Sequence, residues 1–159
     1  MKLYLVQHAK AASEQIDLQR PLTEEGRSDI KKVAAFIKPL NLCVDYLWHS
    51  GKKRVAQTAE VLAEVIKISK TQTVHDGLGP TDDVTALKDE LVSATGDIMV
   101  VGHLPFLSKL TSLLLTGSES ANTVAFRNGG IVCLDRSEEN QWQIDWVITP
   151  ELLARKNQI

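Results

Sequence analysis

Short apolar runs alternate with amphipathic helical segments over the first two thirds of this 159-residue chain. Residues 2–7 form a compact apolar run typical of a buried strand. Residues 23–37 then begin with a capping threonine and place apolar side chains on one helical face, until Pro39 ends the segment. Strands that alternate with helices predict a three-layer α/β/α fold with a mostly parallel central sheet.

The same order of strand, loop and helix recurs along the chain. Further strands are predicted at residues 44–49, 71–74 and 97–102, and further helices at residues 52–66, 84–91 and 105–117. The last third changes character, because it carries three short strand-like runs with turns at residues 128–129 and 138–141. These runs cover residues 123–127, 130–135 and 142–148 and predict antiparallel additions to the sheet.

No repeat or linker divides the sequence, so we expect a single domain over residues 1–159, and a monomer. The net charge of -2 argues against a partner such as nucleic acid or an anionic membrane surface. Neither a signal-peptide core nor a membrane span is visible, which predicts a cytoplasmic protein. Cys43 and Cys133 lack the spacing of a zinc site and are expected to be buried thiols.

Three polar elements follow predicted parallel strands, where such sheets bind their ligands. They are His8, the segment from Ser50 to Arg54, and His103. If they share a pocket, it holds an imidazole able to attack, a guanidinium matched to phosphate oxygens, and a second imidazole able to donate a hydrogen bond. This set favours phosphoryl transfer, whose transition state spreads charge over oxygens that such donors stabilise.

Other interpretations remain open from the pattern alone. A histidine at a strand end is more often a satisfied polar residue than a catalyst, and Arg54 also suits the solvated face of a helix. His49 and His75 are interpreted as structural or surface residues. The four histidines have no metal-ligand spacing, so no metal site is predicted.

Four short motifs, in order, resemble those of the histidine phosphatase superfamily, and in particular its small bacterial SixA-type branch. They are Leu3 to Lys10, Arg20 to Arg27, Ser50 with Arg54 to Glu60, and Gly102 to Pro105, and the closing segment Trp142 to Leu153 is similar as well. The resemblance covers nearly the whole chain and implies a phosphoglycerate mutase-like fold. It also implies a phosphatase of phosphohistidine in proteins, active in signal transduction and needing neither a metal nor an organic cofactor.

The resemblance assigns roles to individual positions. His8 matches the nucleophile that becomes phosphorylated and is then hydrolysed by water. Arg54 matches the arginine that grips phosphate, and His103 matches the histidine that binds and polarises the phosphoryl oxygens. Arg20 matches an arginine at the edge of the phosphate site.

One departure concerns the residue before the nucleophile, which is Gln7 here and arginine in the family. A glutamine amide can donate to a phosphate oxygen, but it has neither the charge nor the fork geometry of guanidinium. Loss of one preorganised donor typically costs about 10²–10³ in rate, so reduced activity is expected. Gly51 stands where proline often follows the serine, a change expected to loosen the loop that carries Arg54.

In the loop from His75 to Asp83, the candidates for a general acid are Asp82 and Asp83, and both are expected to cap the next helix instead. Absence of a clear general acid favours phosphohistidine, whose imidazole leaves readily. Two alternatives stay open. One is a pseudo-phosphatase that binds phosphate or a phosphoprotein without useful turnover; the other is a phosphomonoesterase for a small phosphorylated substrate.

Overall fold

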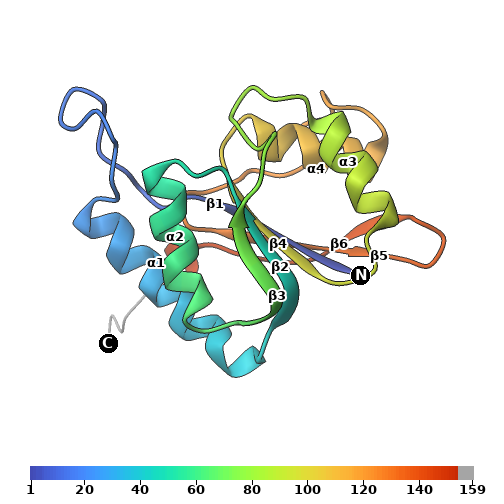
Figure 1. Ribbon diagram of the computed structural model, residues 1–159, viewed down its shortest axis with the longest axis horizontal. Helices are drawn as coiled ribbons and strands as arrows, with labels where there is room; N and C mark the ends of the chain where they lie inside the picture. Colours follow the sequence, from blue (N-terminus) through green and yellow to red (C-terminus); the bar gives the residue numbers. More distant parts are fainter. Residues whose placement is uncertain (154–159) are drawn as a thin grey trace.

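A computed structural model describes residues 1–153 (Figure 1). Its strands are β1 (Lys2–Gln7), β2 (Cys43–His49), β3 (Lys67–Val74), β4 (Ile98–Gly102), β5 (Ile131–Arg136) and β6 (Trp142–Ile148). Its helices are α1 (Glu24–Ile37), α2 (Lys53–Ala63), α3 (Val84–Ser93), α4 (Phe106–Thr116) and α5 (Pro150–Leu153), with a short 3-10 turn, η1 (Lys38–Leu40), after α1. The predicted alternation of strands and helices is therefore confirmed.

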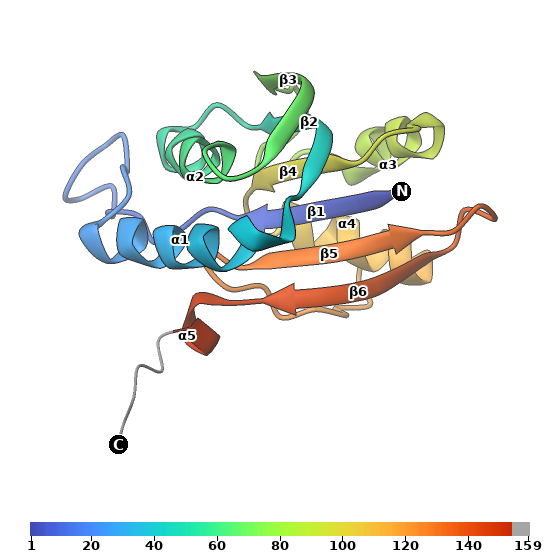
Figure 2. The same cartoon turned by 90° about the horizontal axis from the view of Figure 1, so that it is seen from below.

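The strands form one six-stranded sheet in the order β3-β2-β4-β1-β5-β6 (Figure 2). The first four strands of this order pair in parallel, whereas β5 runs antiparallel to both of its neighbours, β1 and β6. This arrangement confirms a mostly parallel sheet with antiparallel additions. It also brings the carboxyl ends of β1, β2, β3 and β4 to one edge of the sheet.

Helices cover both faces of the sheet, which gives the predicted three layers (Figure 1). In β1, Val6 points to the side of α1 and α2, where it packs in a cluster with Ile30. Leu5 points to the opposite side and packs in a second cluster with Phe106 of α4. The alternation of a fully buried strand thus supplies two cores, and burial of both holds the strand tips in place.

One predicted strand is wrong. Residues 123–127 are irregular, and only Phe126 among them is buried, in the cluster beneath α4. Both sides of β5 are already paired, with β1 and β6, so no place beside β5 is left for the segment that leads into it. The segment therefore contributes apolar side chains to the core and does not pair as a strand of the sheet.

One local prediction is confirmed, and another is confirmed for only one of its two residues. Thr23 is the N-cap of α1, since its hydroxyl accepts a hydrogen bond of 3.0 Å from the Gly26 N–H. The thiol of Cys133 is buried, whereas that of Cys43 is exposed at the start of β2, contrary to expectation. Within residues 1–153, no helix combines the length and the apolar character needed to cross a membrane.

Candidate active site

Two of the predicted site histidines follow neighbouring strands. His8 comes directly after β1, His103 directly after β4, and the His8 N–H donates to the Gly102 carbonyl at 3.1 Å. The two imidazole rings meet edge to face with centroids 5.5 Å apart. The parallel register of β1 and β4 therefore places both rings at one point of the sheet edge.

Arg54 reaches the same point from the first turn of α2. Its Nη2 atom lies 3.3 Å from His103 Nδ1. Its Nε atom is buried and has no hydrogen-bond partner among the described residues. The structure thus brings His8, Arg54 and His103 together, with a guanidinium donor left unused beside the two rings.

The imidazole of His8 has a defined orientation. Its Nδ1 lies 2.7 Å from the Ala9 carbonyl oxygen, which can only accept, so Nδ1 carries the proton and donates. Nε2 is therefore left with its lone pair. Burial, the largest cause, and the nearby Arg54 charge lower the pKa of His8, which keeps the ring neutral and able to attack.

The backbone around His8 is held from two sides. Asn128 Nδ2 donates to the His8 carbonyl oxygen at 3.0 Å, and the Gly129 N–H donates to the same oxygen at 3.2 Å. The next residue, Ala9, donates its N–H to Thr58 Oγ1 on α2 at 3.0 Å. These bonds tie the nucleophile candidate to α2 and to the loop before β5.

His103 is almost completely buried and its two ring nitrogens have different partners. Arg54 can only donate, so His103 Nδ1 accepts, and Nε2–H then donates to Ser50 Oγ at 2.7 Å. Burial, reinforced by the Arg54 charge, lowers the pKa of His103 to about 4. The ring is neutral near pH 7 and can donate a hydrogen bond from Nε2.

Gln7 lies at the end of β1, opposite Gly102 of β4 in the sheet register. Its side-chain oxygen is buried and has no hydrogen-bond partner among the described residues. The residue therefore lies directly before His8 with unused hydrogen-bonding capacity. Its predicted contact with phosphate stays a prediction.

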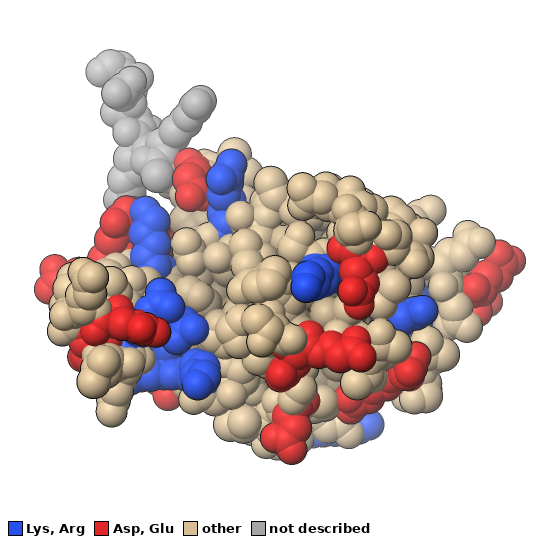
Figure 3. Space-filling model, turned by 90° about the horizontal axis from the view of Figure 1, so that it is seen from above, with Lys and Arg blue, Asp and Glu red and all other residues tan. Residues whose placement is uncertain are grey.

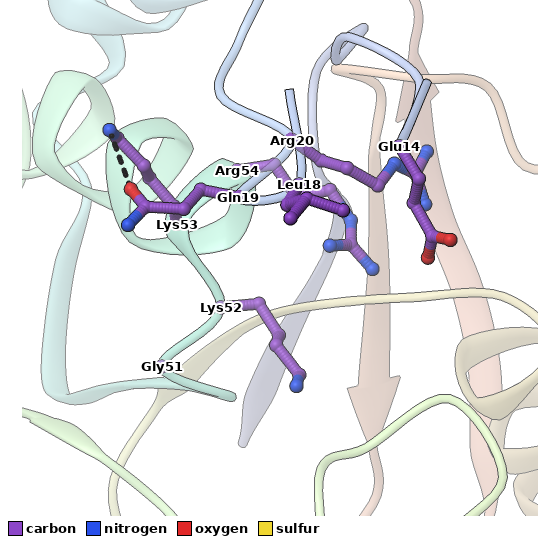
Figure 4. Close-up of a pocket in the computed structure, with 8 residues that line it drawn as sticks. All are labelled: Glu14, Leu18, Gln19, Arg20, Gly51, Lys52, Lys53 and Arg54. Carbon is purple, nitrogen blue, oxygen red and sulfur yellow. Dashed lines mark hydrogen bonds between the residues drawn. The ribbon is translucent and has the colours of Figure 1, made fainter. Parts of the chain in front are cut away.

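Arg20 lies at the edge of a cleft that leads to this point (Figure 4). Its backbone is in the left-handed region, with φ 48°, and its Nε donates to the Ala12 carbonyl at 3.0 Å. The cleft has a volume of about 410 Å³, and its lining residues are Glu14, Leu18, Gln19, Arg20, Gly51, Lys52, Lys53 and Arg54. Arg20 and Arg54 thus line one space, as a phosphate-edge role for Arg20 requires.

Gly51 gives the loop before Arg54 a contact of its own. Its φ of +83° is closed to proline, and its N–H donates to His49 Nδ1 at 3.2 Å. A proline at this position would have neither this backbone angle nor an N–H to donate.

Both candidate acids of the next loop have structural partners, but only Asp83 caps the next helix as expected, whereas Asp82 closes a turn within the loop. Asp83 is the N-cap of α3 and accepts from the Thr85 N–H at 2.9 Å, while Asp82 accepts from the Gly79 N–H at 2.7 Å. Two residues to which the sequence assigned no role contact the site histidines, namely Ser50 against His103 and Asn128 against His8. Position after β2 was a signal for Ser50, whereas Asn128 showed only a turn.

Comparison with known proteins gives consistent matches. A model of the histidine phosphatase superfamily (branch 1) matches residues 3–79. The phosphohistidine phosphatase SixA of Escherichia coli strain K12 is 23% identical over 155 residues, which cover 94% of this chain and 94% of that protein.

Solved structures show the same fold. A structure of the protein histidine phosphatase SixA complexed with tungstate has a TM-score of 0.83 at 23% identity, over 96% of this chain and 99% of that one. A phosphoserine phosphatase from Entamoeba histolytica in complex with 3-phosphoglyceric acid has a TM-score of 0.69 at 17% identity, over 93% of this chain and 96% of that one. Residues 3–79 thus match the histidine phosphatase superfamily, and similarity to SixA over nearly the whole chain supports a SixA-type branch.

Proposed function

We propose that the protein is a phosphatase that removes phosphate from phosphohistidine in a protein, through a covalent phosphohistidine on His8. One observation carries this proposal: His8, Arg54 and His103 meet at a single point of the sheet edge. Similarity to SixA, whose name states that activity, supports the substrate class. Tungstate, which accompanies the SixA structure, is a tetrahedral oxyanion like phosphate.

The first step transfers the phosphoryl group to His8. The Nε2 lone pair of His8 attacks phosphorus while the bond between phosphorus and the substrate nitrogen breaks. The electron pair of that bond stays on the departing imidazole. Arg54 and the His103 Nε2–H stabilise the charge on the phosphoryl oxygens, which replace Ser50 Oγ as the acceptor of the His103 N–H.

The second step regenerates the protein. Water attacks phosphorus on His8, the bond between phosphorus and Nε2 breaks, and inorganic phosphate leaves. A proton from water balances the first departing imidazole, so the net reaction is phosphohistidine plus water to histidine plus phosphate. The Nδ1–H bond to the Ala9 carbonyl holds the ring in one orientation through both steps.

Gln7 favours a second candidate, a module that binds phosphate or a phosphoprotein with little turnover. The amide is neutral, and its unpaired oxygen is an acceptor, which does not stabilise a phosphoryl anion. In this case the pocket and its cations would remain, and the step that needs the strongest charge stabilisation would fail.

Comparison of three substrate classes tests the proposal. Turnover is measured with a phosphohistidine peptide, a phosphoserine peptide of the same sequence, and a sugar phosphate, by release of inorganic phosphate. We expect the phosphohistidine peptide to have the highest kcat/KM, because Asp82 and Asp83 are engaged elsewhere and imidazole needs little acid assistance. Faster turnover of the sugar phosphate would contradict the proposal, and tight binding without any turnover would favour the binding module.

A further inference from the structure

A loop with two exposed apolar side chains projects beside the cleft. It spans residues 12–20 between β1 and α1 and stands out from the body of the molecule (Figure 1). Ile16 is 81% exposed and Leu18 is 87% exposed, and Leu18 also lines the cleft. Large apolar side chains this exposed, next to a candidate active site, are a feature of interaction surfaces.

The exposure of these side chains comes from an ordered loop. Its base is closed by the Ala12 N–H, which donates to the Pro21 carbonyl at 2.8 Å, and by Arg20 Nε, which donates to the Ala12 carbonyl. Its tip is a turn in which the Asp17 N–H donates to the Ser13 carbonyl at 3.0 Å. The backbone thus holds Ile16 and Leu18 outward, so a partner would meet them already in place.

The side of the cleft opposite the loop, formed by the segment from Gly51 to Arg54, is basic. Among the cleft residues, Arg20, Lys52, Lys53 and Arg54 are cationic and Glu14 alone is anionic. Lys52 and Lys53 are exposed, and within the described residues neither forms an ion pair with a carboxylate. Lys53 Nζ instead donates to Gln19 Oε1 at 3.1 Å, and this bond connects the segment from Gly51 to Arg54 with the loop (Figure 4).

Basic side chains form a group beside the loop. The chain as a whole has a net charge of -2, yet several Lys and Arg side chains lie together at the end where the loop projects, with acidic side chains around them (Figure 3). In Figure 4 the Arg54 guanidinium and the Lys52 ammonium group both extend toward the open cleft. Such a group of cations attracts acidic partners and steers them toward the candidate nucleophile.

We propose that Ile16, Leu18, Lys52 and Lys53 form one docking surface for the protein that carries the phosphohistidine. The inference rests on the proposed function and adds the chemistry of the partner: acidic side chains flank its phosphohistidine, with an apolar side chain beside them. A protein fits better than a lipid surface, because insertion of Ile16 and Leu18 into a bilayer would also desolvate the Glu14 and Asp17 carboxylates on the same loop, whereas a protein can contact the apolar side chains and leave both carboxylates in water. A small phosphorylated metabolite in the cleft would leave Ile16 unused.

Binding of defined peptides tests this surface without any need for turnover. The probes carry phosphoryl-triazolylalanine, a stable phosphohistidine analogue, flanked by Asp, Glu and Leu or by Lys and Ser. Fluorescence anisotropy gives Kd for the full chain, for Lys52→Glu/Lys53→Glu, and for Ile16→Ser/Leu18→Ser. Lys31→Glu/Lys32→Glu on the exposed side of α1 is the matched control, since it makes the same charge change away from the cleft.

We expect the acidic, leucine-bearing peptide to bind the unmodified chain at least about tenfold more tightly than the basic peptide. Lys52→Glu/Lys53→Glu should remove that preference, Ile16→Ser/Leu18→Ser should weaken binding of the leucine peptide about threefold to tenfold, and the control should keep both effects. Equal binding of the two peptides, or an unchanged preference in Lys52→Glu/Lys53→Glu, would overturn the proposed surface.

Two further outcomes separate the possible failures. If the peptide preference is present but phosphohistidine is not hydrolysed, the proposed catalysis fails and the docking surface stands. If phosphatidylserine vesicles bind more tightly than the acidic peptide and Ile16→Ser/Leu18→Ser removes that binding, the surface is a membrane contact and the inference is wrong.

Discussion

The four histidines of the chain all lie at the carboxyl edge of the parallel strands, yet they form two different pairs. Across the sheet the order is His75 after β3, His49 at the end of β2, His103 after β4 and His8 after β1. His8 and His103 follow the two central strands of the sheet and are called the inner pair; their ring centroids are 5.5 Å apart. The outer pair, His49 and His75, are engaged in local contacts.

The contacts of the outer pair are structural. The His75 ring packs at a tilt against Trp48 with ring centroids 4.4 Å apart, and its Nε2 lies 2.9 Å from a Glu90 oxygen. His49 is buried and accepts the Gly51 N–H. The expectation that these two histidines are structural or surface residues agrees with those contacts.

The difference between the pairs comes from one loop. After β2 the chain turns at Gly51 and enters α2, so the same segment occupies His49 and delivers Arg54 to His103. A strand end therefore places a histidine at the edge, but only a neighbouring cation and an unused nitrogen suit it for phosphoryl transfer. Four predictions, in order of decreasing effect, test this division.

His8→Ala should reduce kcat toward a phosphohistidine peptide at least about 10³-fold, because no other group in the proposed mechanism attacks phosphorus. His75→Ala should stay within about twofold of the unmodified protein, since its contacts are with Trp48 and Glu90. Steady-state release of inorganic phosphate measures both. Equal losses in the two variants would remove the distinction between the inner and outer pairs.

Gln7→Arg should raise kcat/KM by about one to three orders of magnitude, because it adds a charged, forked donor directly before His8. The matched control is Gln72→Arg, which adds the same charge at an exposed position of β3. Both are measured with the phosphohistidine peptide. No gain with Gln7→Arg, with phosphate binding retained, would favour the binding module over the phosphatase.

Stability should fall as the pH drops from 7 to 5. The pKa of His103 is lowered to about 4 by burial, so the unfolded chain, with a pKa near 6.5, binds the proton first. Unfolding then takes up protons between those values, and His103 alone accounts for about 1–2 kcal/mol of lost stability over this range.

Urea unfolding at pH 7 and pH 5 measures this effect, with His103→Asn for comparison. The variant removes the titrating ring, so its stability should depend less on pH. His8 and His49, whose pKa values are also lowered by burial, should retain the remaining slope. An unchanged pH dependence in His103→Asn would show that this ring is not buried in its neutral form.

Ser50→Ala should lower kcat/KM about fivefold, the effect of losing one hydrogen bond of about 1 kcal/mol that orients His103. The acid limb of the pH profile should shift as well, because the hydroxyl contacts His103 Nε2. Ser93→Ala at the end of α3 is the control, since Ser93 Oγ donates only to a backbone carbonyl. A drop in kcat/KM without any change in the pH profile would argue against positioning by Ser50.

Much of the fold was predictable because strand and helix periods differ so clearly. The buried run from Lys2 to Gln7 and the helical spacing of α1 each indicated one structure, and the strand ends followed from them. Residues 123–127 show the limit of this prediction. An apolar run indicates burial, but it does not indicate whether a position in the sheet is free for it.

The site was predictable at the level of strand ends and not at the level of hydrogen bonds. His8 and His103 directly follow apolar runs, but the contact of Ser50 with His103 depends on the path of a loop. The bond from Asn128 to the His8 carbonyl joins positions 120 residues apart, and no local pattern reports such a contact. The positive φ of Gly51 likewise became visible only in the folded chain.

A crystal structure with orthovanadate tests most directly whether three separate elements serve one anion. We expect vanadium within bonding distance of His8 Nε2, with Arg54 and His103 donating to its oxygens and Gln7 directly beside them. Vanadate bound elsewhere, or bound in the cleft without contact to His8, would contradict both the phosphatase and the phosphate-binding module.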